Sequence, residues 1–165
     1  MLESFLEFSY GLLETVGLPV LFAIFVLKGS LIGKVFPTSV FLPGYVLAIR
    51  ATYWEAALVV LVVTVAHVLG QLVVYAGCRR YGRPFVESNS YLDLETERFD
   101  RWFAQYGGVA IFATNVVPWT RGVIAIPAGV NSYPVGRYTT YISASTVLYH
   151  GAYVTLALAG IAVLV

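Results

Sequence analysis

Charge is scarce in this sequence and almost absent from its last third. Charged residues make up 12% of the chain and hydrophobic residues 59%, against roughly 25% and 45–50% in soluble domains. No carboxylate occurs after Asp100, and the only cations beyond Arg101 are Arg121 and Arg137. These absences exclude an ordinary soluble domain and predict an integral membrane protein.

Three further absences narrow the class. The single cysteine, Cys78, cannot form an intrachain disulfide, and no cluster of residues has metal-ligand spacing. The net charge of +1 gives no basic surplus for nucleic acid. Glu3, Glu7 and Glu14 do not match the basic start of a secretory signal. We therefore expect one membrane domain over residues 1–165, with no metal, no cofactor and no nucleic-acid partner.

Long uncharged runs predict the membrane spans. Residues 56–77 carry no charge, and at about 1.5 Å per helical residue they reach about 33 Å, enough for a hydrocarbon core of about 30 Å. Residues 138–165 form a second such run. The predicted spans are about 54–77 and 134–165, together with a third at about 18–34, an apolar helix that carries Lys28 and Lys34 near its end.

Two other apolar segments are interrupted by proline and glycine. Proline has no N–H and disfavours helix in the residue before it. Broken backbone at membrane depth survives only where protein or a wet cavity satisfies its polar groups. We therefore predict re-entrant helical hairpins at about 35–49 and 107–132. The residues expected to shape them are Pro37, Pro43, Gly44, Pro118, Pro127 and Gly129.

The polar stretch 78–106 separates the two interrupted segments. Arg79, Arg80 and Arg83 follow the 54–77 span directly, which favours a cytoplasmic location. Residues 92–106 mix charges with aromatic side chains and predict an amphipathic helix on the membrane surface. We interpret 78–106 as a cytoplasmic amphipathic linker.

The two halves of the chain repeat one theme, an interrupted apolar segment followed by a long span. The offset is about 81 residues, as between Pro37 and Pro118 or Gly70 and Gly151. Paired interrupted segments at corresponding positions point to a transporter site at the interface of the repeats.

Arg121 is the candidate centre of such a site. A charge in hydrocarbon costs roughly 2.5–3.5 kcal/mol even on lenient scales, and the surrounding sequence offers no carboxylate. An arginine can donate two parallel hydrogen bonds to a phosphate, and the N-termini of broken helices favour anions. The expected substrate-binding residues are Arg121, Thr120, Asn115, Pro118, Trp119, Ser39, Thr38, Pro37 and Lys28. The expected ligand is an anionic lipid headgroup.

Simpler interpretations stay open for several of these residues. Arg121 could extend to an interface beside a turn, and Lys28 could mark the end of a helix. The hydroxyls of Ser39, Thr38 and Thr120 could bond to local backbone. Two further candidates, His67 and His150, lie within spans, where a neighbouring helix or a proton relay could engage them.

The spacing Asn115, Pro118, Arg121, followed by Ala128 and Gly129, resembles the second-half signature of the DedA family, also called VTT-domain or SNARE-associated Golgi proteins. The resemblance covers roughly residues 28–160. It implies two re-entrant hairpins facing each other in an inverted repeat. It also implies movement of phospholipids or polyprenyl phosphates between the leaflets of a cell membrane by a multi-pass protein.

The chain departs from the family where proton coupling is attributed. Asn115 stands where the family has the first of two arginines, Ser39 stands where many members carry glutamate, and Lys28 replaces another acidic position. Proton-driven transport is therefore in doubt, and downhill scrambling or another ion remains open.

The leading hypothesis is a lipid flippase or scramblase for a phosphate-bearing lipid, polyprenyl phosphate or phospholipid, without catalytic residues. The alternatives are a non-transporting protein of membrane homeostasis or organisation, a proton- or ion-coupled small-solute transporter, and a lipid phosphatase. The last lacks a nucleophile with an orienting partner. The oligomeric state, including a homodimer, is left open.

Overall fold

The computed structural model describes residues 17–31, 38–87, 96–118 and 120–160. Every regular element in these ranges is a helix, which confirms the all-α prediction. The elements are the helix Gly17–Gly29, α2 (Thr38–Ala48), α3 (Tyr53–Glu87), α4 (Thr96–Tyr106), α5 (Gly108–Val116), α6 (Ala125–Val130) and α7 (Val135–Leu158). Parts of the predicted segments lie outside the described residues. These are 32–37, which includes Pro37, the linker residues 88–95, Trp119, and 161–165 at the end of the last predicted span.

α3 is the longest element. Its apolar part is rich in valine, which is a poor helix former in water. In hydrocarbon a helix is nevertheless favoured, because every backbone group must find a partner inside the chain. Thr52 and Glu55 begin the helix with a capping box: the Thr52 N–H donates to Glu55 Oε2 at 2.7 Å, and the Glu55 N–H donates to Thr52 Oγ1 at 3.4 Å. A kink at Gly82, where φ is 66°, ends the straight part.

One helix within the described ranges, Tyr53–Pro84, is long and apolar enough to cross a membrane. It extends beyond the predicted 54–77 span through Arg79 and Arg80. The helix Gly17–Gly29 and α2 are apolar but shorter. α7 covers 24 residues of the predicted 134–165 span.

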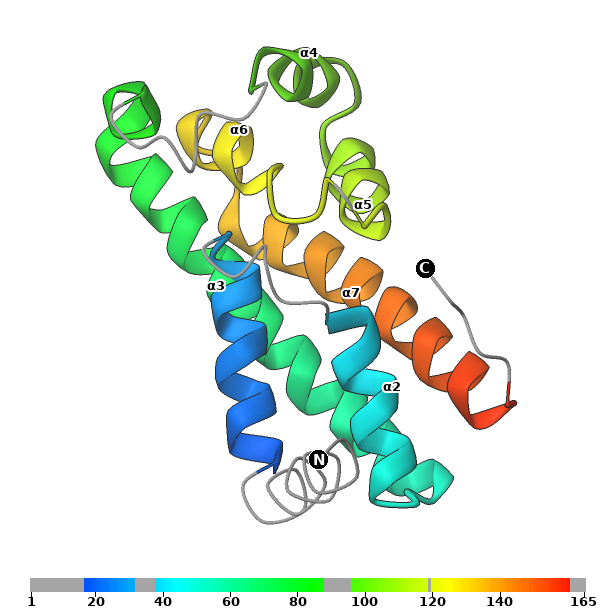
Figure 1. Cartoon of the computed structure of the whole chain (residues 1–165). Coiled ribbons are helices and arrows are strands. Elements are labelled where there is room, and N and C mark those ends of the chain that lie inside the picture. The colour runs from blue at the N-terminus through cyan, green and yellow to red at the C-terminus, as the bar shows by residue number, and fades with distance from the viewer. Residues whose placement is uncertain (1–16, 32–37, 88–95, 119, 161–165) are drawn as a thin grey trace.

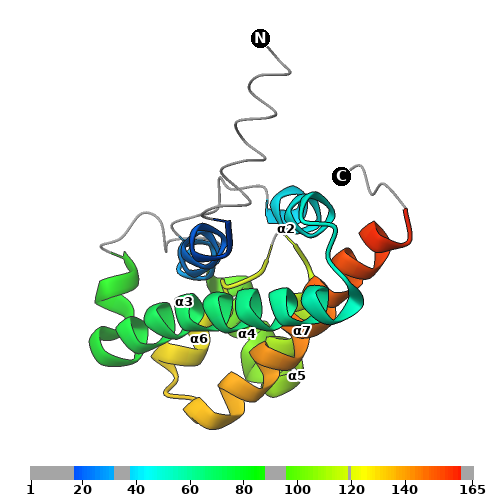
Figure 2. The same cartoon turned by 90° about the horizontal axis from the view of Figure 1, so that it is seen from below.

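α3 and α7 cross and hold the other helices together (Figure 1). The helix Gly17–Gly29 and α2 lie on one side of α3, and α5 and α6 lie towards the other (Figure 2). α2 packs against α7, while α6 packs against α3, so each short helix contacts the long helix of the other half of the chain. The segment between α5 and α6 thereby reaches the interior.

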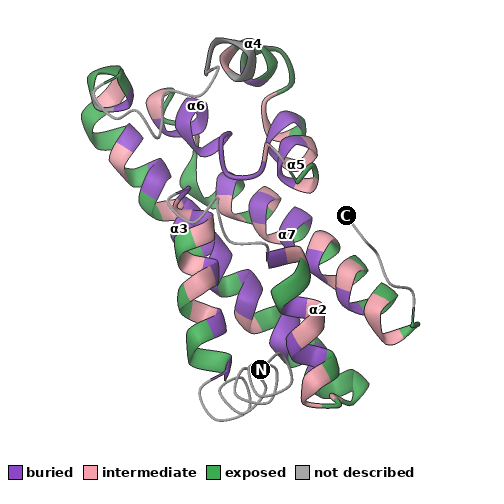
Figure 3. Ribbon diagram, viewed as in Figure 1, coloured by how far each residue is buried: buried purple, intermediate pink, exposed green. Residues whose placement is uncertain are grey.

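Two clusters of buried side chains meet along α3 and α7. One joins the helix Gly17–Gly29 and α2 to the first half of α3 and to Val154; the other joins the second half of α3 to α5, α6 and the first half of α7. Residues 121–129 are buried throughout, including the turn before α6 (Figure 3). Arg121 therefore stands at the start of a fully buried segment.

Many large apolar side chains point outward instead. Contiguous apolar surface of this kind is rare on soluble monomers and marks contact with a membrane or a partner. On α2, α3 and α7 the exposed set includes Val40, Phe41, Leu47, Leu58, Leu61, Val65, Leu69, Val73, Val147, Leu148 and Leu156.

The segment around Pro43 differs from the prediction. Pro43 and Gly44, which were expected to break the segment 35–49, lie inside the continuous helix α2. Proline interrupts a helix by the one hydrogen bond it cannot donate, here to the Ser39 carbonyl, and α2 continues around that gap. Pro127 similarly lies within α6, in its first turn, where the proline N–H would have no helical partner anyway.

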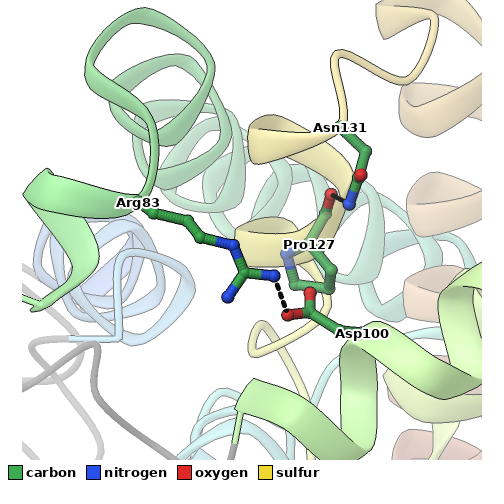
Figure 4. Close-up of polar contacts among 4 residues, drawn as sticks. All are labelled: Arg83, Asp100, Pro127 and Asn131. Atoms are coloured by element: carbon green, nitrogen blue, oxygen red, sulfur yellow. Dashed lines mark hydrogen bonds and ion pairs between the residues drawn. The ribbon is translucent and has the colours of Figure 1, made fainter.

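α4 lies over the ends of α5 and α6. It is amphipathic as predicted, with Phe103 buried against Tyr133 and Trp102 exposed. Arg83 at the end of α3 forms an ion pair with Asp100 of α4 at 2.7 Å, next to the α6 turn in which Asn131 donates to the Pro127 carbonyl (Figure 4). Such an exposed pair contributes about 0–1 kcal/mol, so apolar contacts of Phe103 do most to hold α4.

Candidate functional site

Arg121 lies in the turn between α5 and α6 and is 8% exposed. The turn is closed by backbone hydrogen bonds from Val123 to Thr120 and from Ala125 to Gly122. No ion pair between described residues involves Arg121. The guanidinium is therefore a buried cation that the described part of the chain does not neutralise, and it does not extend into solvent.

Two residues of α7 contact the guanidinium. Arg121 Nη1 lies 3.3 Å from His150 Nε2, and Arg121 Cζ lies 3.9 Å from the centroid of the Tyr149 ring. A guanidinium can only donate, so His150 Nε2 accepts and the proton of a neutral ring lies on Nδ1. The face of Tyr149 adds a cation–π contact. Both contacts are neutral and leave the charge uncompensated.

One edge of the guanidinium is unused. Arg121 Nε and Nη2 are buried and have no hydrogen-bond partner among the described residues. These two nitrogens form the side of the planar fork that binds two oxygens of one phosphate or carboxylate in parallel. A buried unpartnered polar atom costs about 1–3 kcal/mol, so an arriving anion would recover stability here.

His67 of α3 lies beside this group. Its ring centroid is 5.8 Å from that of His150, and both rings contact Phe25 edge-on. His67 is 1% exposed and both its ring nitrogens lack a partner, as does His150 Nδ1. The Phe25 carbonyl lies near the His67 ring without forming a hydrogen bond of normal geometry.

Glycines bring these elements together. A Cβ on Gly70 of α3 would lie 2.1 Å from the Val26 carbonyl oxygen, and one on Gly29 would lie 2.2 Å from the His67 carbonyl oxygen. The two helices therefore cross at backbone contact. Gly122 has φ of +82°, and a Cβ there would lie 2.9 Å from Leu31. The turn that carries Arg121 thus needs glycine both for its conformation and for space.

A second polar group lies on the same long helices, but its bonds are complete. Gln71 Nε2 donates to Asn115 Oδ1 at 2.7 Å, and Asn115 Nδ2 lies within hydrogen-bond distance of Ser145 Oγ and Thr146 Oγ1, both at 2.8 Å. Tyr138 donates to Gln71 Oε1 at 3.1 Å. Asn115, expected to bind substrate, is 0% exposed and joins α5 to α3 and α7.

The other expected residues fall into distinct surroundings. Thr120 donates to the Thr114 carbonyl at 2.7 Å, which is the local backbone bond of the simpler interpretation, and Pro118 is exposed. Thr38 is buried at the start of α2, and Ser39 is half-buried. Lys28 is half-buried at the end of the helix Gly17–Gly29. Pro37 and Trp119 lie outside the described residues.

The residues that sequence reasoning left out of the site had a detectable pattern. Thr64, His67 and Gln71 recur at spacings of three and four in an otherwise apolar helix, which places them on one face. Tyr149 and His150 lie one helical turn after Ser145 and Thr146 in the same way. A search for polar stripes on the two predicted spans would have identified His67 on one span and His150 on the other as neighbours of Arg121.

An apolar groove lies elsewhere between the first half of α3 and the second half of α7. Its volume is about 490 Å³, and Trp54, Leu58, Leu61, Val147 and Gly151 are among its lining residues. Because almost no polar atom faces it, it offers nothing to an anionic group, and the polar candidate site remains the cluster around Arg121.

The family model of the VTT domain matches residues 36–158 of the sequence. The chain belongs to the VTT-domain (DedA) family. This confirms the family expected from the spacing of Asn115, Pro118 and Arg121, and with it a membrane protein.

Two curated relatives accompany the family match. This chain is 32% identical over 111 residues to the uncharacterized membrane protein YkoX of Bacillus subtilis (strain 168). The aligned region covers 61% of the chain and 50% of the relative. It is 30% identical over 98 residues to undecaprenyl phosphate transporter A of Staphylococcus aureus (strain NCTC 8325 / PS 47), covering 54% of the chain and 48% of the relative. The chain spans about half the length of these relatives. No solved structure matches it significantly.

Proposed function

We propose that this protein moves a phosphate-bearing lipid, such as a polyprenyl phosphate or a phospholipid, between the leaflets of a cell membrane. The observation that carries the proposal is the unpartnered Nε and Nη2 edge of buried Arg121. The family match supports it, as does a relative named for undecaprenyl phosphate transport.

Arg121 has the chemistry that transient headgroup binding needs. A guanidinium stays charged in proteins, and its fork donates two hydrogen bonds to one phosphate. Burial strengthens this attraction because the surroundings are less polar than water. No bond is made or broken in the step. The phosphate gives up hydrogen bonds to water and forms hydrogen bonds to the protein instead.

The arrangement of the helices supports an inverted repeat with two hairpins. In this proposal α2 corresponds to α6 at the offset of about 81 residues, and α3 corresponds to α7. The reciprocal packing of α2 on α7 and α6 on α3 is what such a repeat requires. The hairpins enter the membrane without crossing it, and the protein is multi-pass. Arg121 then lies where the two halves meet.

Exchange of the lipid does not need a carboxylate at this site. The described residues form no ion pair with Arg121, and Ser39 and Asn115 stand at the positions where the family resemblance implies charges. We therefore favour downhill exchange over proton-driven transport. An ionophore that collapses the proton gradient should leave the exchange rate unchanged.

The deciding experiment compares Arg121→Gln with the wild type in liposomes that contain a fluorescent polyprenyl phosphate. Each charge-assisted hydrogen bond contributes about 1.5–3 kcal/mol, so leaflet exchange should fall by about tenfold or more. Arg121→Lys keeps the positive charge but lacks the two parallel donors of the guanidinium, so its leaflet exchange should stay close to that of Arg121→Gln.

Arg137→Gln is the matched control, because Arg137 is an exposed arginine at the start of α7. It should exchange lipid like the wild type. Equal exchange by Arg121→Gln and the wild type would refute the proposal. Loss of function on replacing Trp102 and Phe103 of α4, with Arg121 dispensable, would instead favour a membrane-organising protein.

A further inference from the structure

The unpartnered polar atoms near Arg121 come from three further side chains. His150 Nδ1, both nitrogens of His67 and Thr64 Oγ1 are buried without hydrogen-bond partners among the described residues. Thr64 and His67 are three residues apart and share one face of α3. The His67 and His150 rings are 5.8 Å apart, and His150 contacts Arg121. Thr64 and His67 on α3 and His150 on α7 therefore bring buried, unpartnered polar atoms into the neighbourhood of Arg121.

Among the described residues, Thr64 carries the one buried hydroxyl without a hydrogen-bond partner. A serine or threonine inside a helix usually donates to the carbonyl four residues earlier. Thr114, Thr139, Thr140 and Ser145 all do so, at 2.6 to 3.0 Å. Thr64 Oγ1 makes no such bond although the residue is 4% exposed. Its hydroxyl is free to donate to a ligand.

The two histidines complete the donor set. His150 accepts from Arg121 through Nε2, so its Nδ1–H is a donor without an acceptor. A neutral His67 also carries one N–H. The charged or titratable groups in contact with His150 are the Arg121 guanidinium, the His67 ring and the Tyr149 ring. The cluster therefore offers several donors and a positive charge, which suits a ligand with several acceptor oxygens.

We propose that Thr64, His67 and His150 form the second wall of the anion site, donating hydrogen bonds to a phosphate whose other oxygens are held by Arg121. This inference rests on the proposed function and adds residues from α3 and α7 to it. It also accounts for the polar stripe on α3. Thr64 and His67 would face the ligand, while Gln71, one turn beyond His67, bonds to Asn115 in the neighbouring hydrogen-bond network.

Binding of labelled farnesyl phosphate to the purified full chain in nanodiscs tests the proposal. Thr64→Val removes the hydroxyl at nearly constant shape, and His67→Leu and His150→Leu remove the ring donors. Each should weaken binding by about tenfold. His67→Gln and His150→Gln keep an N–H donor and should recover part of the affinity.

Thr114→Val is the control, because Thr114 is buried but its hydroxyl already donates to the Ala110 carbonyl. It should bind farnesyl phosphate like the wild type. The thermal unfolding of every variant is compared first. A histidine-to-leucine variant that does not fold is replaced by the histidine-to-glutamine variant at the same position.

A second measurement reports contact directly. The chain has two histidines, so ¹⁵N-histidine labelling gives few ring signals, which His150→Gln assigns. Farnesyl phosphate should shift the ring nitrogens of both histidines, and farnesol, which lacks the phosphate, should not. Inorganic phosphate that displaces farnesyl phosphate with the same shifts would support the site with free phosphate as its ligand.

The outcomes separate this inference from the proposed function. Wild-type affinity in Thr64→Val and both histidine-to-leucine variants, with unmoved histidine signals, would overturn the second wall. If Arg121→Gln alone loses binding in that case, the proposed function stands. If Arg121→Gln also binds farnesyl phosphate normally, both fail.

Discussion

At the scale of single residues, two buried polar groups on the same helices differ in whether their hydrogen bonds are complete. Asn115, Gln71, Tyr138, Ser145 and Thr146 bond to one another across α3, α5 and α7. The atoms around Arg121 include several with no partner. A complete network stabilises one arrangement of helices, whereas an incomplete one is unstable until a ligand joins it. The first group therefore supports the fold and the second is suited to binding.

Replacing Asn115 should accordingly affect stability. Asn115→Ala leaves the buried amide of Gln71 without its acceptor and removes the donor to Ser145 and Thr146. We expect a loss of about 2–4 kcal/mol in the free energy of unfolding, measured by denaturant titration in micelles. Gln105→Ala, at an exposed amide side chain of α4, is the control and should change little. An unfolding midpoint unchanged by Asn115→Ala would contradict a supporting role.

Sequence reasoning reached Arg121 because an arginine without a carboxylate is visible in the sequence itself. It did not reach His67, His150 or Thr64 as a group, because their proximity depends on how α3 and α7 cross. It placed Asn115 in the substrate site because the residue lies near Arg121 in the interrupted segment, while the structure gives that side chain protein partners. Which polar atoms remain unpartnered is a property of the packed molecule and cannot be read from spacing.

At the scale of elements, the helix Gly17–Gly29 and α3 cross through Gly29 and Gly70. Small residues let membrane helices approach to backbone contact. Sequence comparison pairs Gly70 with Gly151 at the offset of about 81 residues, but a Cβ at Gly151 would meet no atom within 4 Å. The two glycines that the sequence offset pairs therefore differ in packing. Pro43 likewise lies inside the continuous helix α2, where its position in the sequence predicted a break.

This contrast predicts opposite effects of one substitution. Gly70→Ala places a methyl group 2.1 Å from the Val26 carbonyl oxygen, so the helices must separate, at a cost of about 1–3 kcal/mol. Gly151→Ala meets open space and should stabilise α7 by up to about 1 kcal/mol. Thermal unfolding of both variants in the same detergent tests this. Equal effects would show that Gly29 and Gly70 are not in contact.

At the scale of the whole molecule, the charges of α3 and α4 predict an orientation in the membrane. Arg79, Arg80 and Arg83 lie at one end of α3, and α4 lies nearby through the Arg83–Asp100 ion pair. Tyr53 and Trp54 begin the other end and are exposed. Positive charge stays on the cytoplasmic side, and aromatic side chains favour the membrane interface. The arginine end with α4 is therefore expected in the cytoplasm and the Tyr53 end on the opposite side.

Cysteine labelling in whole cells tests this orientation. The single native cysteine, Cys78, is buried, and Cys78→Ser provides a background without thiols. In that background we expect Tyr53→Cys to react with a membrane-impermeant maleimide in intact cells, because Tyr53 is 83% exposed at the outer end of α3. Gln105→Cys, on the exposed surface of α4, should react only after the cells are permeabilised. Labelling of both positions in intact cells would mean that α3 does not cross the membrane between Tyr53 and Arg83, and Arg121 would then not lie at the depth that lipid exchange requires.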